Sequence, residues 1–82
     1  MVKVKYDEEF EKALDKIKDQ VLREKIAKQI VKIINFPEVG KPMRYNRKGT
    51  REVYVHPFRI SYEYLKEIDL IEFLELYHKD EQ

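Results

Sequence analysis

Two short runs rich in β-branched and aromatic residues flank His56-Pro57, and they constrain the fold more than any other feature of the chain. Residues 51–55 and 58–64 each alternate with a period of two, which predicts an antiparallel pair of strands that turns at His56-Pro57. The apolar residues of each run then face one side of the sheet, and the charged residues face the other. Such a sheet needs a second layer on its apolar side only.

Two amphipathic helices before the hairpin can form this second layer. Asp7 and Asp19 are each placed to cap the start of a helix, and apolar residues recur at helical spacing behind both. The second helix should end near Asn35, because Pro37 restricts the residue before it and cannot donate to a continuing helix. The alternating segment at residues 2–6 predicts one further strand at the start of the chain.

The last part of the chain predicts a final strand. Residues 70–77 follow a turn over residues 66–69; spacing alone would also permit a helix, but the preceding hairpin favours a strand. Residues 38–49 contain two glycines and a proline and predict a connecting loop. The order β-α-α-β-β-β therefore predicts an α+β fold, with an N-terminal helical hairpin packed on one face of a small, mostly antiparallel sheet.

Length and composition limit what the chain can be. With 82 residues, we expect a single domain over residues 1–82. The chain contains no cysteine, so we expect neither disulfides nor thiolate metal sites, and no apolar run is long enough to span a membrane. The start of the sequence lacks the apolar core of a signal peptide. We therefore expect a cytoplasmic protein without a membrane partner.

Basic residues are concentrated in the loop before the hairpin. The net charge of the whole chain is only +1, yet the segment from Gly40 to Arg51 carries no acidic residue. Such a segment can be a solvated loop, or it can contact a polyanion. Its basic residues are Lys41, Arg44, Arg47, Lys48 and Arg51.

Motifs for metals and nucleotides are absent from the sequence. It contains no glycine-rich phosphate loop, no H-E-x-x-H motif, and no carboxylate cluster at ligand spacing. We therefore expect no metal and no cofactor.

The hairpin and the loop before it resemble those of the RelE/ParE toxin superfamily. The resemblance rests on GKPMRYNRKGTREVYVHPFRISYEY and on the apolar strand that ends in LYHKDEQ. It implies the same β-α-α-β-β-β fold and a toxin of a type II toxin–antitoxin pair, whose partner is a small helical antitoxin. In the RelE branch it implies an endoribonuclease that cuts messenger RNA on the ribosome. In the ParE branch it implies an inhibitor of gyrase.

The resemblance also implies roles for single residues. Arg59 falls on the arginine that RelE-like nucleases use on the scissile phosphate, and Tyr77 and His78 fall near C-terminal residues with acid–base roles. Glu52 and Tyr54 stand where RelE carries two lysines. The residues expected to hold RNA are Lys41, Arg44, Arg47, Lys48, Arg51 and Tyr54.

Cleavage of RNA without a metal requires a proton acceptor, a cation on the phosphate and a proton donor. We expect Arg59 to supply the cation, and His78 with Tyr77 to transfer protons, with the guanidinium and the imidazole reaching one phosphodiester. Alternatives stay open: Arg59 can pair across the sheet with Glu52 or Glu63, and the chain can be a ParE-like gyrase inhibitor, an inactive member or a plain RNA-binding module.

Overall fold

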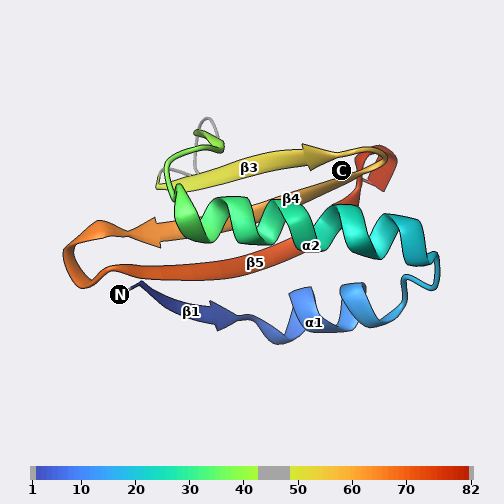
Figure 1. The fold of residues 1–82 in the computed structure, drawn as a ribbon, viewed down its shortest axis with the longest axis horizontal. Coiled ribbons are helices and arrows are strands. Elements are labelled where there is room, and N and C mark those ends of the chain that lie inside the picture. The colour runs from blue at the N-terminus through green and yellow to red at the C-terminus, as the bar shows by residue number, and fades with distance from the viewer. Residues whose placement is uncertain (1, 43–48, 82) are drawn as a thin grey trace.

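Two helices lie on one face of a five-stranded mixed sheet (Figure 1). The computed structural model describes residues 2–42 and 49–81. The elements are β1 (Lys3–Tyr6), α1 (Glu8–Asp15), α2 (Gln20–Asn35), β2 (Lys41–Pro42), β3 (Thr50–Val55), β4 (Phe58–Leu65) and β5 (Leu70–His78), with short 3-10 helices at Lys66–Ile68 and Lys79–Glu81. The predicted α+β fold is thereby confirmed.

The strand order in the sheet is β1-β5-β4-β3-β2. The first and last strands of the chain pair in parallel, and all other pairs are antiparallel. The short edge strand β2 was not predicted, because its two residues lie in a segment whose glycines and proline indicate a loop. It pairs with β3 only at Arg51 and Glu52. From Val53 onward, β2 therefore does not pair with β3.

The two predicted helix caps behave differently. The side chain of Asp19 accepts hydrogen bonds from the backbone nitrogens of Val21 (2.9 Å) and Leu22 (3.3 Å), as expected for an N-cap. Asp7 stands at the same position before α1, but its side chain forms no capping bond. It forms a hydrogen bond with Glu72 of β5 instead. The side chain of Asp7 therefore contacts the sheet and does not cap α1.

An arginine of α2 stabilises the end of α1. The Nη1 atom of Arg23 donates to the carbonyl oxygens of Leu14 (2.7 Å) and Ile17 (3.0 Å). These carbonyls lie in and just after the last turn of α1, where the backbone carbonyls have no hydrogen-bond donor within the helix. The contact therefore joins the two helices of the hairpin at their connection.

The core lies between the helices and the sheet. Phe10 of α1 and Phe73 of β5 are fully buried, and their ring centroids lie 5.4 Å apart. Tyr6 stacks on Phe73 at 5.1 Å. The other fully buried apolar and aromatic side chains come from α2, β4 and β5 and are Ile26, Ile33, Ile60, Tyr62 and Ile71.

A bulge in β5 decides which of its side chains face the helices. Tyr62 pairs with Phe73 and Ser61 pairs with Glu75, so Leu74 is the extra residue. Because the bulge shifts the alternation by one residue, Phe73 and Leu76 are both buried although they are three positions apart. It also decides the orientation of every residue between Leu76 and the end of the strand.

Candidate functional site

A carboxylate on the open face of the sheet connects three strands. The Oε1 atom of Glu52 (β3) lies 3.2 Å from Nη1 of Arg59 (β4), and the hydroxyl of Tyr77 (β5) donates to Oε2 of Glu52 at 3.0 Å. The Arg59 and Glu52 side chains are about one quarter exposed, at 26% and 25%. Both are therefore shielded enough to hold a defined geometry, and both can still be reached from solvent.

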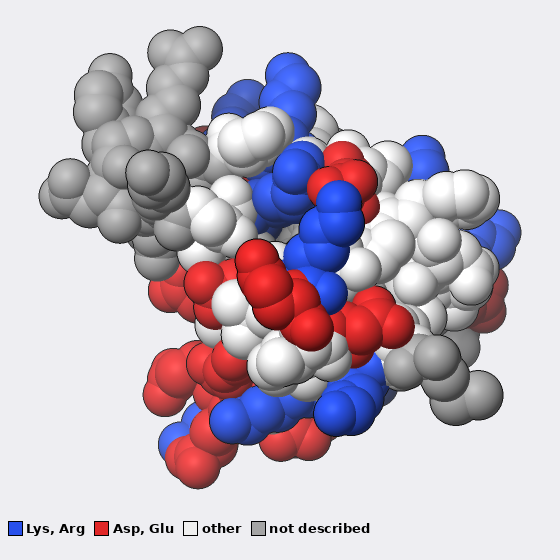
Figure 2. Space-filling view, turned by 90° about the vertical axis from the view of Figure 1, so that its left-hand side faces the viewer, with Lys and Arg blue, Asp and Glu red and all other residues white. Residues whose placement is uncertain are grey.

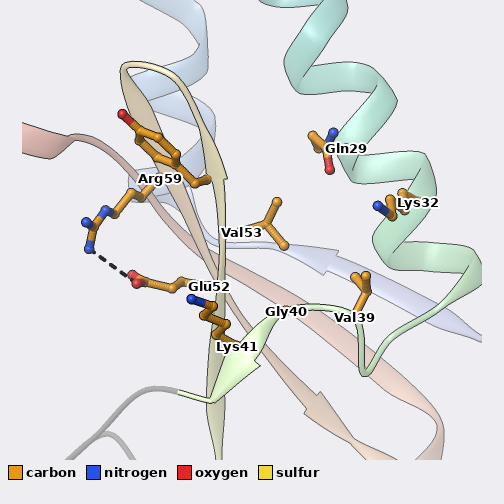
Figure 3. A pocket seen from close by; sticks show the side chains of 9 residues that line it. Gln29, Lys32, Val39, Gly40, Lys41, Glu52, Val53 and Arg59 are labelled. Carbon is orange, nitrogen blue, oxygen red and sulfur yellow. Dashed lines mark hydrogen bonds and ion pairs between the residues drawn. The ribbon is translucent and has the colours of Figure 1, made fainter.

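This cluster borders a pocket of about 490 Å³ at the edge of β3 (Figure 3). Lys32 of α2 and Lys41 of β2 also line the pocket, so three cations and one carboxylate surround it. Val39 and Val53 form part of its apolar lining. The pocket is lined by residues of α2, β2, β3 and β4, at the edge where β2 pairs with Arg51 and Glu52 of β3. Its chemistry suits an anionic ligand with an apolar part.

Tyr54 presents a half-exposed ring next to this cluster. Its hydroxyl lies 2.8 Å from Nδ1 of His56. The guanidinium carbon of Arg59 and the ammonium of Lys79 each lie 5.8 Å from the centre of its ring. These contacts orient an aromatic surface of which 50% is exposed. A ring held in this way is able to stack on a nucleobase.

The residues expected to bind RNA have different surroundings. Lys41 is exposed and lines the pocket. Arg51 donates from Nη1 to the carbonyl oxygens of Glu38 (3.1 Å) and Gly40 (2.8 Å), so its guanidinium holds the connection between α2 and β2. The other three expected residues, Arg44, Arg47 and Lys48, lie outside the described residues.

Basic and acidic side chains are mixed at one end of the molecule. Figure 2 shows Lys and Arg side chains beside Asp and Glu side chains on that face. The described residues visible there form no continuous basic surface. Attraction of a polyanion to the described part of this face would therefore depend on individual cations.

The structure does not bring His78 to Arg59. Arg59 pairs with Tyr77 in the sheet, whereas His78 pairs with Phe58. The rings of His78 and Phe58 are in edge contact, with centroids 5.4 Å apart. Neighbouring residues of a strand point to opposite faces, so His78 lies on the helix side of the sheet and Arg59 on the open side. Nδ1 of His78 accepts a hydrogen bond from the backbone nitrogen of Asp80 (3.2 Å). The expectation that both groups reach one phosphodiester is therefore wrong, and the separate roles of the two residues stay predictions.

Comparison with protein families places the chain. A family model described as the ParE toxin of the type II toxin–antitoxin system, parDE, matches residues 4–82. The chain belongs to this family. It is therefore a toxin of a type II toxin–antitoxin system, as the resemblance of its hairpin implied. A comparison with curated proteins found no significant match.

Solved structures show the same fold as this toxin. The E. coli RelBE toxin–antitoxin complex contains a chain with a TM-score of 0.81 and 17% identity, and each chain is covered completely. A YoeB/ParE toxin from Agrobacterium tumefaciens has a TM-score of 0.82 and 15% identity, with coverage of 94% of this chain and 98% of the other. The archaeal RelE–RelB complex from Pyrococcus horikoshii has a TM-score of 0.76 and 15% identity, with coverage of 99% and 98%.

Glu52 is the residue of the toxin's cluster that the sequence assigned no chemical role. Hairpin geometry could have located it. The turn places Tyr54 opposite Arg59, so Glu52 is the diagonal neighbour of Arg59 on the same face. Of the two carboxylates that the sequence offered as partners of Arg59, the structure shows an ion pair with Glu52.

Other acidic residues of the toxin gather on β4, β5 and the end of β1. A hydrogen bond with Asp7, reinforced by burial, raises the pKa of Glu72. Glu63 lies opposite Glu72 in the sheet and raises this pKa further, whereas Lys5 on the other side lowers it. Among residues 2–42 and 49–81, no three Asp, Glu or His side chains are arranged to hold a metal ion. In the same residues, no helix is long and apolar enough to cross a membrane.

Proposed function

We propose that this toxin is a metal-independent endoribonuclease that cleaves messenger RNA on the ribosome. The observation that supports the proposal is the cluster in which Arg59 and Tyr77 contact the same carboxylate beside a cation-lined pocket. A phosphodiester that replaces part of these contacts would meet a guanidinium on one side and a phenol on the other. Both groups are needed for cleavage through the 2′-hydroxyl.

The two groups have distinct tasks in this reaction. Arg59 donates to the non-bridging oxygens, whose negative charge grows in the transition state. The hydroxyl of Tyr77 protonates the 5′-oxygen as it leaves. Lys41 holds the adjacent phosphate, and Tyr54 stacks on a neighbouring base. The products are a 2′,3′-cyclic phosphate and a 5′-hydroxyl end.

The partners follow from the same proposal. The toxin acts in the cytoplasm, where ribosomes and messenger RNA are present. Relatives of the same fold occur in complexes named for an antitoxin, RelBE and RelE–RelB. We propose a small helical antitoxin as the partner of this chain, bound so that it covers the pocket and the basic loop.

The test is growth arrest together with primer extension on programmed ribosomes. Arg59→Ala should abolish growth arrest and lower the cleavage rate by roughly 10²- to 10³-fold. Lys66→Ala, which removes an exposed cation just beyond the end of β4, serves as the control and should cleave like the wild type. If wild-type toxin arrests growth but leaves messenger RNA on programmed ribosomes intact, the proposal is wrong.

A second candidate is a ParE-like inhibitor of gyrase that breaks no bond in RNA. The observation that favours it is the ion pair itself, because Glu52 at 3.2 Å already neutralises the charge of Arg59. Inhibition of DNA supercoiling by purified toxin, with messenger RNA left uncut, would establish this candidate.

A further inference from the structure

We infer that Glu52 is the group that accepts the proton of the RNA 2′-hydroxyl, in place of the expected His78. This inference rests on the proposed nuclease function and adds its missing proton acceptor. The substrate it requires is an RNA strand with a free 2′-hydroxyl next to the scissile phosphate.

Position is the first argument. Among the described residues that line the pocket, Glu52 is the only one with a carboxylate. It is in direct contact with Arg59 and Tyr77, the two groups assigned to the phosphate and the leaving oxygen. His78 lies on the other face of the sheet. A nucleotide whose phosphate reaches Arg59 therefore brings its ribose to Glu52 and not to His78.

Groups from three neighbouring strands hold the Glu52 carboxylate in place. Arg59 approaches from β4, the Tyr77 hydroxyl donates from β5, and Lys41 is its direct partner on β2. Lys32 lies across the pocket on α2 (Figure 3). These contacts fix the positions of the carboxylate oxygens, one of which would accept the proton.

The step balances without any further reactant. The 2′-hydroxyl proton passes to Glu52 while the 2′-oxygen forms a bond to phosphorus. The bond between phosphorus and the 5′-oxygen breaks, and this oxygen takes the proton of the Tyr77 hydroxyl. Tyr77 then regains a proton from Glu52 along their hydrogen bond, which restores both groups. One proton has moved from the 2′-oxygen to the 5′-oxygen.

The first experiment is single-turnover cleavage on programmed ribosomes over a range of pH. Glu52→Gln should lower the rate by roughly 10²- to 10⁴-fold and remove the rise in rate that accompanies ionisation of the carboxylate. A residue that only positions Arg59 would lower the rate and leave that rise in place. Glu75→Gln is the matched control on the same face, two strands away on β5, and should retain both the rate and the pH profile.

The second experiment separates proton acceptance from proton donation. A substrate with sulfur in place of the scissile 5′-oxygen has a leaving group that needs little protonation. On this substrate the defect of Tyr77→Phe should largely disappear, whereas the defect of Glu52→Gln should persist at a similar fold-change. Unfolding by urea should show that both variants are folded under the assay conditions.

The outcomes distinguish the two proposals. If wild-type toxin cleaves the message and Glu52→Gln cleaves it equally well, or keeps the wild-type pH profile, Glu52 is not the proton acceptor although the nuclease function stands. If the sulfur substrate rescues Glu52→Gln, the carboxylate acts on the leaving group and the inference is also wrong. If wild-type toxin does not cleave RNA, the nuclease function and this inference are both overturned.

Discussion

The hydroxyl of Tyr62 accepts a hydrogen bond from the backbone nitrogen of Gly40 at 2.9 Å, across 22 positions of sequence. The same hydroxyl donates to the carbonyl oxygen of Pro37 at 2.7 Å. Burial raises the pKa of Tyr62, so the hydroxyl keeps the proton that it donates. One side chain of β4 therefore holds the connection that leads from α2 into β2 and the pocket.

Tyr62→Phe should destabilise the fold by roughly 1–3 kcal/mol, because it leaves the Gly40 nitrogen and the Pro37 carbonyl without this partner. The free energy of unfolding in urea measures the effect. Tyr6→Phe is the matched control, since its ring remains stacked on Phe73 and its side chain is 40% exposed. It should change the free energy by less than about 0.5 kcal/mol. Equal effects of the two variants would contradict this account.

Gly40→Ala should also destabilise the fold, by roughly 1–3 kcal/mol. An added methyl group would lie 2.7 Å from the Tyr62 hydroxyl and 3.0 Å from the carbonyl oxygen of Glu52, so the chain must shift at the entrance to the pocket. Urea unfolding of both single variants and the double variant with Tyr62→Phe tests this. Loss of the Tyr62 hydroxyl relieves one close contact with the added methyl group. The destabilisation of the double variant should therefore be smaller than the sum of the two single-variant effects.

Arg51→Ala should lower stability by roughly 1–3 kcal/mol, because two backbone carbonyls of the connection lose a charged donor. Lys41→Ala removes an exposed neighbouring cation and should leave stability within about 0.5 kcal/mol. Thermal or urea unfolding of the two variants makes the comparison. Unchanged stability of Arg51→Ala would contradict this structural role and would leave RNA binding as the only role expected of Arg51.

Glu72→Gln should raise stability near neutral pH. The fold raises the pKa of Glu72, so the folded state holds this proton more tightly than the unfolded chain does. The stability that this proton contributes is complete below about pH 4.5, the ordinary pKa of a glutamate. It is lost as the pH rises through the raised pKa of Glu72. The difference between variant and wild type should therefore vanish in acid and favour the variant above this range. Glu67→Gln, on an exposed turn, is the comparison variant in the same pH-dependent unfolding, and an equal pH trend in the two variants would contradict this account.

Much of the fold could be predicted because the signals were local. The period of two in residues 51–55 and 58–64 depends only on alternating side chains, and the structure confirms both strands and their turn. The end of α2 at Asn35 follows from the geometry of the nearby proline. The cap at Asp19 likewise depends on residues two and three positions away.

Apart from the edge strand β2, the sequence by itself therefore determined the elements of this toxin, their order and the face of the hairpin that carries charges. Only the tertiary structure decided the site. The bulge at Leu74 turned His78 away from Arg59, and the pairing of β2 with β3 placed Lys41 opposite Glu52 at the pocket. Both depend on how strands far apart in sequence align, and a shift of one residue reverses the face of a side chain without changing the local pattern.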